Sequence, residues 1–342
     1  SPSRSRCSGR TTRTWPPRTT AWPTCTRGWA SAKRRWGLAI TIKVRGPDHP
    51  YVAASYFNTA NVYYDQGKLD EALELHEKSL AIKIKVHGPD HPSVAASYNG
   101  MANVFYYQGK HEKALDLHKK SLAITIKVLG PDHPDVAASY FNMGDAYYDQ
   151  GKLEEALALY EKSRAIMSKV LPHDLAAFAT LYNGMAEVFL AQGRHAEALT
   201  LHTKVIEIKG MRNDNQGLAS SYSNMATVYQ KLGMHADALA LYEKGQAIKI
   251  AVLGEDHLDV AWSYNNIANV YAAQSRYTEA LALHEKSQAI TIKVLGKDNL
   301  DIVASYNGMA TIYHAQCKYV AALELFEKGK AIMIKALGHN HT

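Results

Sequence analysis

A tyrosine recurs through this sequence at an almost constant interval, at Tyr56, Tyr98, Tyr140, Tyr182, Tyr222, Tyr264 and Tyr306. Every step is 42 residues except the one from Tyr182 to Tyr222, which is 40. The letters GPDHP keep the same register at 46–50, 88–92 and 130–134, with altered copies at 254–258 and 296–300. A period of this length predicts a stack of seven similar units rather than one globular core, because each unit buries its apolar face against its neighbours.

Each unit contains the pattern of two helices. Pro50 suits a first helical turn, and Gly67 suits a left-handed cap that ends a helix. Helices are therefore predicted over 50–66 and 69–86, the second one ended by the next GPDHP. Residues at a spacing of three or four predict one buried stripe in each helix. In the first helix the stripe consists of Val52, Tyr56, Thr59, Ala60 and Tyr63, and in the second of Ala72, Leu75, Ser79, Ile82 and Val86.

The connection over 209–217 departs from this pattern. It lacks the GPDHP letters and two residues, and it contains two added glycines. A shortened second helix and a local change in the stacking of the repeats are expected there. Whether this junction divides the array or only marks sequence drift stays open.

Three positions in the repeat are small or aromatic in every unit. They are occupied by Ala60, Ala102, Gly144, Ala186, Ala226, Ala268 and Ala310, by Tyr63, Phe105, Tyr147, Phe189, Tyr229, Tyr271 and Tyr313, and by Ala72, Ala114, Ala156, Ala198, Ala238, Ala280 and Ala322. The pattern resembles the tetratricopeptide repeat (TPR), and the 42-residue length with its GPDHP connection resembles the longer repeats of kinesin light chains. HEAT and armadillo arrays have similar periods but would not demand this small–aromatic–small pattern. The resemblance covers about residues 38–342 and implies an all-α fold, a right-handed superhelical solenoid of helix-turn-helix repeats.

The net charge of +7 belongs to one end of the chain. Residues 1–36 hold nine basic residues and no acidic one, which leaves 30 basic and 32 acidic residues in 37–342. The repeats are close to neutral and give no electrostatic case for a nucleic-acid partner. No apolar run approaches the roughly 18 residues that a membrane span needs. Three cysteines cannot build a disulfide framework, so we expect a cytoplasmic protein without a membrane partner.

We divide the chain into residues 1–36 and a TPR solenoid over 37–342, with seven complete repeats after a partial leading helix. The codons of the segment 22–26, shifted by one base, permit Met-Ala-Asn-Val-Tyr, which nearly matches the residues at 101–105. We therefore hypothesise that 1–36 is a frameshifted remnant of an eighth repeat, disordered as a polypeptide. A transit peptide or a nucleic-acid-binding arm is the alternative for this Arg-rich segment.

The sequence contains none of the GxGxxG, GxxxxGK[ST], HExxH, CxxC or GxSxG motifs. Equivalent histidines of neighbouring repeats are separated by a helix-packing distance of ~10 Å, whereas zinc ligands lie ~2 Å from one point. We expect no enzymatic activity, no metal and no cofactor, and an incidental exposed thiol at Cys317. Packing and connection roles are expected for His76, His118, His202 and His284 on second helices, and for His49, His91 and His133 in the connections.

The TPR resemblance implies a concave face lined by the first helices. Positions one, five, eight and nine residues after the recurring tyrosine project into that face. Asparagine is a poor helix former, and its amide suits a peptide backbone, so the contacts expected first are Asn99, Asn103, Asn265 and Asn269. The alternative is that these asparagines bond only between helices or to water. The full set of candidate peptide-binding residues is Phe57, Asn61, Tyr64, Asn99, Asn103, Tyr106, Phe141, Asp145, Asn183, Asn265, Asn269 and Asn307.

These features favour a non-catalytic scaffold or adaptor that binds partner peptides, without the coiled coil through which a kinesin light chain holds its motor. Over the four concave-face positions of all seven repeats, the acidic residues are Asp65, Asp145, Asp149 and Glu187, and Lys231 is the one lysine or arginine. A neutral or mildly basic peptide is therefore expected. Two alternatives stay open: an array that self-associates end to end, and a sensor or regulatory fragment of a larger multidomain protein. The chain stops at a connection to a further helix, as a fragment would.

The frameshift hypothesis predicts that the genomic DNA over residues 1–36 encodes a repeat in a shifted frame, beginning LAITIKVLGPDHPDVAASYNG. Sequencing that DNA and translating all three frames checks it. If no shifted frame encodes the repeat, the hypothesis is wrong.

Overall fold

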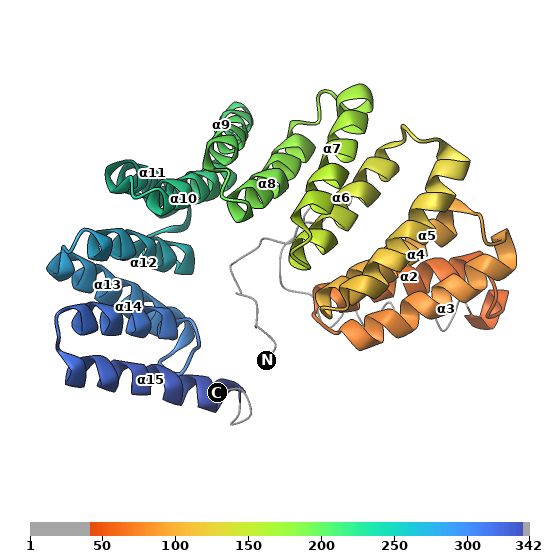
Figure 1. Cartoon of the computed structure of the whole chain (residues 1–342). Helices are drawn as coiled ribbons and strands as arrows, with labels where there is room; N and C mark the ends of the chain where they lie inside the picture. The colour runs from red at the N-terminus through yellow and green to blue at the C-terminus, as the bar shows by residue number, and fades with distance from the viewer. Residues whose placement is uncertain (1–41, 338–342) are drawn as a thin grey trace. The chain divides into compact units, whose positions relative to one another are not determined.

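The structure is a computed structural model that describes residues 42–337. The proposed frameshifted segment lies outside these residues. Within them the regular structure is helical, without a strand, and first and second helices of each repeat alternate along the chain (Figure 1). The first helices are α2 (Pro50–Asp65), α4 (Pro92–Tyr107), α6 (Pro134–Asp149), α8 (Leu175–Ala191), α10 (Asn215–Lys231), α12 (Leu258–Ala273) and α14 (Ile302–Ala315). The second helices are α3 (Leu69–His87), α5 (His111–Leu129), α7 (Leu153–Val170), α9 (His195–Met211), α11 (His235–Leu253), α13 (Tyr277–Leu295) and α15 (Tyr319–Leu337).

The chain forms two compact units whose boundary falls between Val188 and Phe189, inside α8. In the first unit, α3 packs against α4 and α5 packs against α6. In the second unit, each helix from α9 to α14 packs against the next one. The irregular junction over 209–217 lies within the second unit and not at the boundary. Helix α9 has 17 residues where α3, α5, α11, α13 and α15 have 19, which confirms the predicted shortening.

The small residues of the repeat lie where its two helices meet. Ala60 on α2 and Ala72 on α3 have no exposed surface, and the equivalent alanines in the other repeats are at most 3% exposed. A side chain without atoms beyond Cβ lets two helices approach closely. This contact fixes the spacing at which longer side chains from the two helices reach one another.

Four of the five residues of the GPDHP connection have separate structural roles, as residues 88–92 show. Gly88 adopts a φ of 83° after the end of α3, a backbone conformation that glycine accepts without steric cost. Asp90 pairs with Lys127 at the far end of the same repeat. His91 caps α4, because its Nδ1 accepts the Ser93 N–H at 3.1 Å, and Pro92 is the first helical residue. The connection histidines are therefore helix caps, as they also are at His49, His133 and His257.

The buried stripe predicted for α3 is only partly correct. Ala72, Ser79 and Ile82 are buried, but Val86 is 41% exposed, so its prediction as a core residue was wrong. The last turn of α3 lies beside the polar connection, where the neighbouring Lys85 pairs with Asp48. Lys83, three residues before Val86, is buried instead, at 8% exposure.

The turns between the first and second helix of each repeat follow the prediction. Gly67 and its equivalents have positive φ, and Cys317, which replaces that glycine in the last repeat, adopts a φ of 60°. The Cys317 thiol is free and exposed, as expected.

Replacing Asp214 by alanine should lower the free energy of unfolding by about 1–2 kcal/mol. Asp214 caps α10 by accepting the Gly217 N–H at 2.9 Å, and it pairs with Lys209 at 2.5 Å, where neither side chain is fully exposed. The matched control is Asp256→Ala, whose pair with Lys293 has side chains 62% and 65% exposed and whose position is not a cap. Urea unfolding measures both variants; equal losses would show that the cap adds nothing.

Candidate functional site

The candidate residues lie on first helices and differ in exposure. Nine belong to the first unit, and Asn265, Asn269 and Asn307 belong to the second. Phe141, Asp145 and Asn265 are at most 8% exposed, whereas Asn269 and Asn307 are exposed, and the rest are half-buried. We call the surface that these residues line in each unit its first-helix surface. Side chains one residue after the recurring tyrosine form its floor, and those five residues after it lie one helical turn further along.

Two of the floor asparagines are held by buried histidines of the same repeat. His118 Nδ1 lies 2.8 Å from Asn99 Oδ1, and His284 Nδ1 lies 2.8 Å from Asn265 Oδ1. Burial lowers the pKa of both imidazoles to about 4, so each ring is neutral at pH 7 and carries a single N–H. With that proton on Nδ1, the ring donates to the amide oxygen. Ser305 donates to Asn265 Oδ1 as well, at 3.1 Å.

This arrangement fixes the direction of the two carboxamides. Their oxygens accept hydrogen bonds from below, and within residues 42–337 their nitrogens have no hydrogen-bond partner. Neither nitrogen is enclosed by the protein in that part of the chain, so both unpaired nitrogens keep some exposed surface. Each amide therefore presents N–H donors with a set orientation, which suits the carbonyl oxygen of a peptide.

Where the second helix has tyrosine instead of histidine, its side chain forms a hydrogen bond to a different position of the first helix. Tyr160 donates its hydroxyl proton to Asp145. The Tyr242 hydroxyl lies 2.9 Å from the Thr227 hydroxyl and also donates to Gln230 Oε1 at 3.2 Å. A phenol hydroxyl reaches further than an imidazole nitrogen, so it contacts the residue five positions after the recurring tyrosine rather than one position after it.

Two lysines, the buried Lys83 and the half-buried Lys249, also reach the first-helix surfaces from the second helices. Lys83 donates to Ser97 Oγ at 2.8 Å, with its ammonium 4.2 Å from the centre of the Phe57 ring. Lys249 donates to Ser263 Oγ at 3.0 Å and lies 3.5 Å from Ser223 Oγ. Burial lowers the pKa of Lys83 to about 8 and also lowers that of Lys249.

Sequence reasoning missed these lysines because it considered first helices alone. The available signal was their phase: Lys83 follows buried positions 72, 76 and 79 at the spacing of one helical stripe.

Aromatic side chains collect at the C-terminal ends of the first helices in the first unit. The Tyr64 and Tyr107 rings meet edge to face at 5.2 Å, and Tyr106 meets Tyr107 at 5.6 Å. Tyr106 donates to Asp149. Burial and the neighbouring Tyr107 raise the pKa of Tyr64 far above its usual value, so the phenol is neutral. Such rings offer apolar area with a polar edge.

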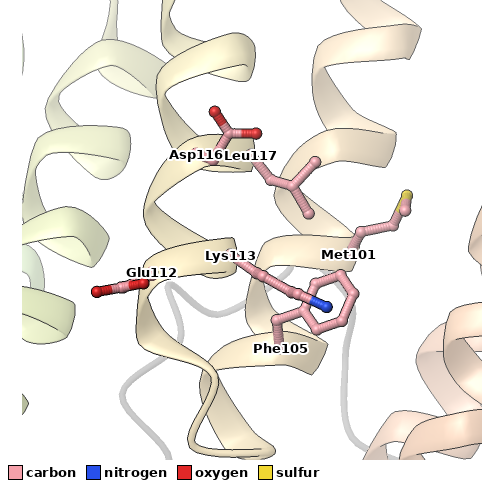
Figure 2. Close-up of a pocket in the computed structure, with 6 residues that line it drawn as sticks. All are labelled: Met101, Phe105, Glu112, Lys113, Asp116 and Leu117. Carbon is pink, nitrogen blue, oxygen red and sulfur yellow. The ribbon is translucent and has the colours of Figure 1, made fainter.

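A shallow depression of about 420 Å³ lies at the helix pair α4 and α5 (Figure 2). Its floor is apolar, formed by Met101, Phe105 and Leu117, and the Lys113 ammonium lies 5.6 Å from the centre of the Phe105 ring. Figure 2 shows the Glu112 carboxylate pointing away from this floor. The depression does not bring acidic and basic groups together around one point, so it has no arrangement suited to catalysis.

Residues 42–337 contain neither a cluster of metal-ligating side chains nor a helix suited to cross a bilayer. No three His, Cys, Asp or Glu side chains gather in the way that a metal ion requires. None of the described helices combines the length and apolar character needed to cross a bilayer.

Comparison with known proteins identifies the family of the repeats. The family profile described as tetratricopeptide repeat matches residues 37–85, 58–127, 93–169, 177–249, 217–276 and 259–335. The chain belongs to the tetratricopeptide repeat family. No curated protein sequence matches it significantly.

Solved structures share the TPR fold at low sequence identity. The apo form of the quorum sensor NprR from B. thuringiensis has a TM-score of 0.70 at 14% identity, over 90% of this chain and 84% of that one. BtubC (BKLC) from P. vanneervenii has a TM-score of 0.54 at 16% identity, over 68% and 91%. A putative kinesin light chain with TPR-like repeats from Podosopora anserina is 26% identical over 72% and 98%, with a TM-score of 0.36.

The buried histidines predict an acid-sensitive fold. Burial lowers the pKa of His76, His118, His202 and His284 from 6.5 to about 4, with the Lys83 charge adding to the effect at His76. Between these pH values the unfolded chain binds more protons than the folded one, so stability is complete above pH 6.5 and is lost as pH falls towards 4. Each of these histidines should lower the free energy of unfolding by about 2 kcal/mol as the pH falls from 7 to 5.

Urea unfolding at a series of pH values measures this loss. His76→Tyr should reduce it by about one histidine's share, because tyrosine occupies the same position at Tyr160 beside Phe141. The matched control is His257→Asn, a substitution at an exposed helix cap. An unchanged pH dependence in His76→Tyr would contradict the assignment.

Proposed function

We propose that this chain is a non-catalytic scaffold that binds extended peptide segments of partner proteins on the first-helix surfaces of its two units. The observation that carries the proposal is the histidine-held asparagine, which occurs once in each unit, at Asn99 and at Asn265. A mid-helix asparagine whose oxygen is fixed and whose nitrogen has no partner in the described residues has a donor to offer. An extended peptide has a carbonyl oxygen at every residue to accept it.

The surroundings of these donors support the same function. In the first unit, half-buried tyrosines at Tyr64 and Tyr106 adjoin the asparagine positions and offer rigid contact area to a passing chain. TPR proteins are typically interaction scaffolds, and this family membership agrees with the proposal.

Replacing Asn103 and Asn269 by alanine should weaken peptide binding roughly tenfold or more, because each substitution removes a hydrogen-bonding amide from the surface. Neither side chain forms a hydrogen bond within residues 42–337, so the double variant should stay as stable as the parent. A peptide-display selection on the full chain, followed by affinity measurement of the enriched peptide, makes the test. The matched control replaces Asn58 and Asn215, two exposed asparagines outside the candidate positions.

A peptide bound equally by parent and Asn103/Asn269 variant would exclude these two positions from the site, and a lack of any enriched peptide would contradict peptide binding. The mass of the chain is measured at the same concentrations. A mass that rises with concentration would favour end-to-end self-association instead. The exposed face of α15 is where that contact would form, since Phe326 is 42% exposed while its equivalents His76, Tyr160 and Tyr242 are at most 3% exposed.

A further inference from the structure

The depression at α4 and α5 lies on a different surface from the candidate peptide-binding residues. Met101 and Phe105, which line it, alternate along α4 with Asn99 and Asn103. Residues two apart on a helix point about 200° away from each other. The rest of the lining comes from the first two turns of α5, a second helix. A ligand in this depression therefore has no need of the first-helix surface.

The second repeat differs from the others at position 113, where it has a positive charge. Lys113 lies in the first turn of α5, and the equivalent residue is acidic in five repeats and alanine in the last. The acidic equivalents are Glu71, Glu155, Glu197, Asp237 and Glu279. The start of a helix favours acidic side chains and disfavours basic ones. The stability of α5 therefore gives no reason for a lysine at this position.

The lysine at position 113 also leaves the residue of the preceding turn without an ion pair. In the fourth repeat the turn residue Arg194 pairs with Glu197 at 2.9 Å, and the sixth repeat has the same pair. In the second repeat both positions are lysine, and within residues 42–337 neither Lys110 nor Lys113 pairs with a carboxylate. Their ammonium groups lie 5.8 and 5.6 Å from the centre of the Phe105 ring. Two positive charges thus lie beside the depression.

The acidic residues that line the depression do not neutralise these two lysines. Asp116 pairs with Lys120 on its own helix at 2.8 Å. The Glu112 carboxylate points away from the floor of the depression (Figure 2). Lys110 donates to the neutral side-chain amide of Gln108 at 2.8 Å. The charge that lacks a counter-ion at this place in the described residues is therefore positive.

The floor of the depression is apolar and has the size of a small-molecule site. Met101 and Leu117 are buried, and Phe105 is half-buried. Figure 2 shows the Lys113 side chain extended over the Phe105 ring. The volume of about 420 Å³ falls within the range of ~300–1,000 Å³ that small organic ligands occupy. An apolar floor with ammonium groups at its edge suits a molecule that has an apolar body and an anionic end.

We propose that this depression binds a small amphipathic organic anion, such as a medium-chain carboxylate. The apolar part of the ligand covers the floor, and its anionic end pairs with Lys110 and Lys113. A charge-assisted hydrogen bond replaces the contact between the Lys113 ammonium and the Phe105 ring, which leaves the ring to the apolar part of the ligand. The site is independent of the proposed peptide binding. It occurs once among the seven repeats, because one repeat alone has lysine at position 113.

The test is a titration of the full chain with octanoate and with decanoate, followed by NMR of isotope-labelled methionine methyl groups. The Met101 signal, assigned with Met101→Leu, should shift and saturate. Decanoate should bind roughly tenfold more tightly than octanoate, because two further methylene groups are buried. Octan-1-ol, which lacks the charge, should bind at least tenfold more weakly than octanoate. Methionines at the equivalent position of other repeats are internal controls and should not shift; they are Met143, Met185, Met225 and Met309.

Lys113→Glu should weaken decanoate binding at least tenfold, because the new carboxylate repels that of the ligand. The matched control is Lys119→Glu, which makes the same change of charge at an exposed residue of α5 that does not line the depression. It should leave the affinity unchanged. Glutamate occupies position 113 in four other repeats and position 119 in five, so both variants suit the fold.

Several outcomes would overturn this proposal. Equal weakening by Lys113→Glu and Lys119→Glu would show that the net charge of the chain, and not this site, attracts the anion. Unchanged binding by Lys113→Glu, equal affinity for octan-1-ol, equal shifts of all five methionine signals, or no binding of either carboxylate would contradict it as well. None of these results bears on peptide binding, because the first-helix surface takes no part in them.

Discussion

The contact between two small residues, an alanine or Gly144 on the first helix and an alanine on the second, is the constraint on which the rest of this structure depends. Ala60 and Ala72 are fully buried against one another's helices, and their equivalents keep that burial through the array. A larger residue would hold the helices apart, and an imidazole on the second helix would no longer reach an amide on the first. The 2.8 Å contacts of His118 and His284 are therefore a consequence of small side chains about one helical turn away that take no part in them.

The periodicity of the sequence was sufficient to predict the helices, because two structural rules act at every repeat. Pro and Gly begin and end the helices, and small residues mark their contact, so the boundaries of α2 and α3 differ from the predicted ones by about one residue. Val86 was wrongly predicted to be buried, because the spacing of a stripe shows which side of the helix a residue is on but not whether another helix packs against it there. The division inside α8 had no sequence signal comparable to the break at 209–217.

The candidate site was less predictable, since it depends on side chains that meet from different helices. The sequence placed Asn99 and Asn265 on the relevant helices, but whether an amide faces outward depends on the tautomer of a histidine 19 residues later. Lys83 and Lys249 were not predicted for a related reason, since they reach the first helices from the second ones. Such a position on the second helix is ordinarily apolar, and only the hydrogen bond to Ser97 or Ser263 on the next first helix explains how an ammonium occupies it.

The pairing of Asp48 with Lys85 has a consequence for how such a chain can change over generations. Both partners belong to one 42-residue segment, as do the helix cap, the alanine contact and the histidine–asparagine pair of the second repeat. Copying one segment therefore copies a complete set of internal bonds, and the new repeat needs only a neighbour's apolar face. An array built this way can gain or lose whole repeats without redesign of those that remain.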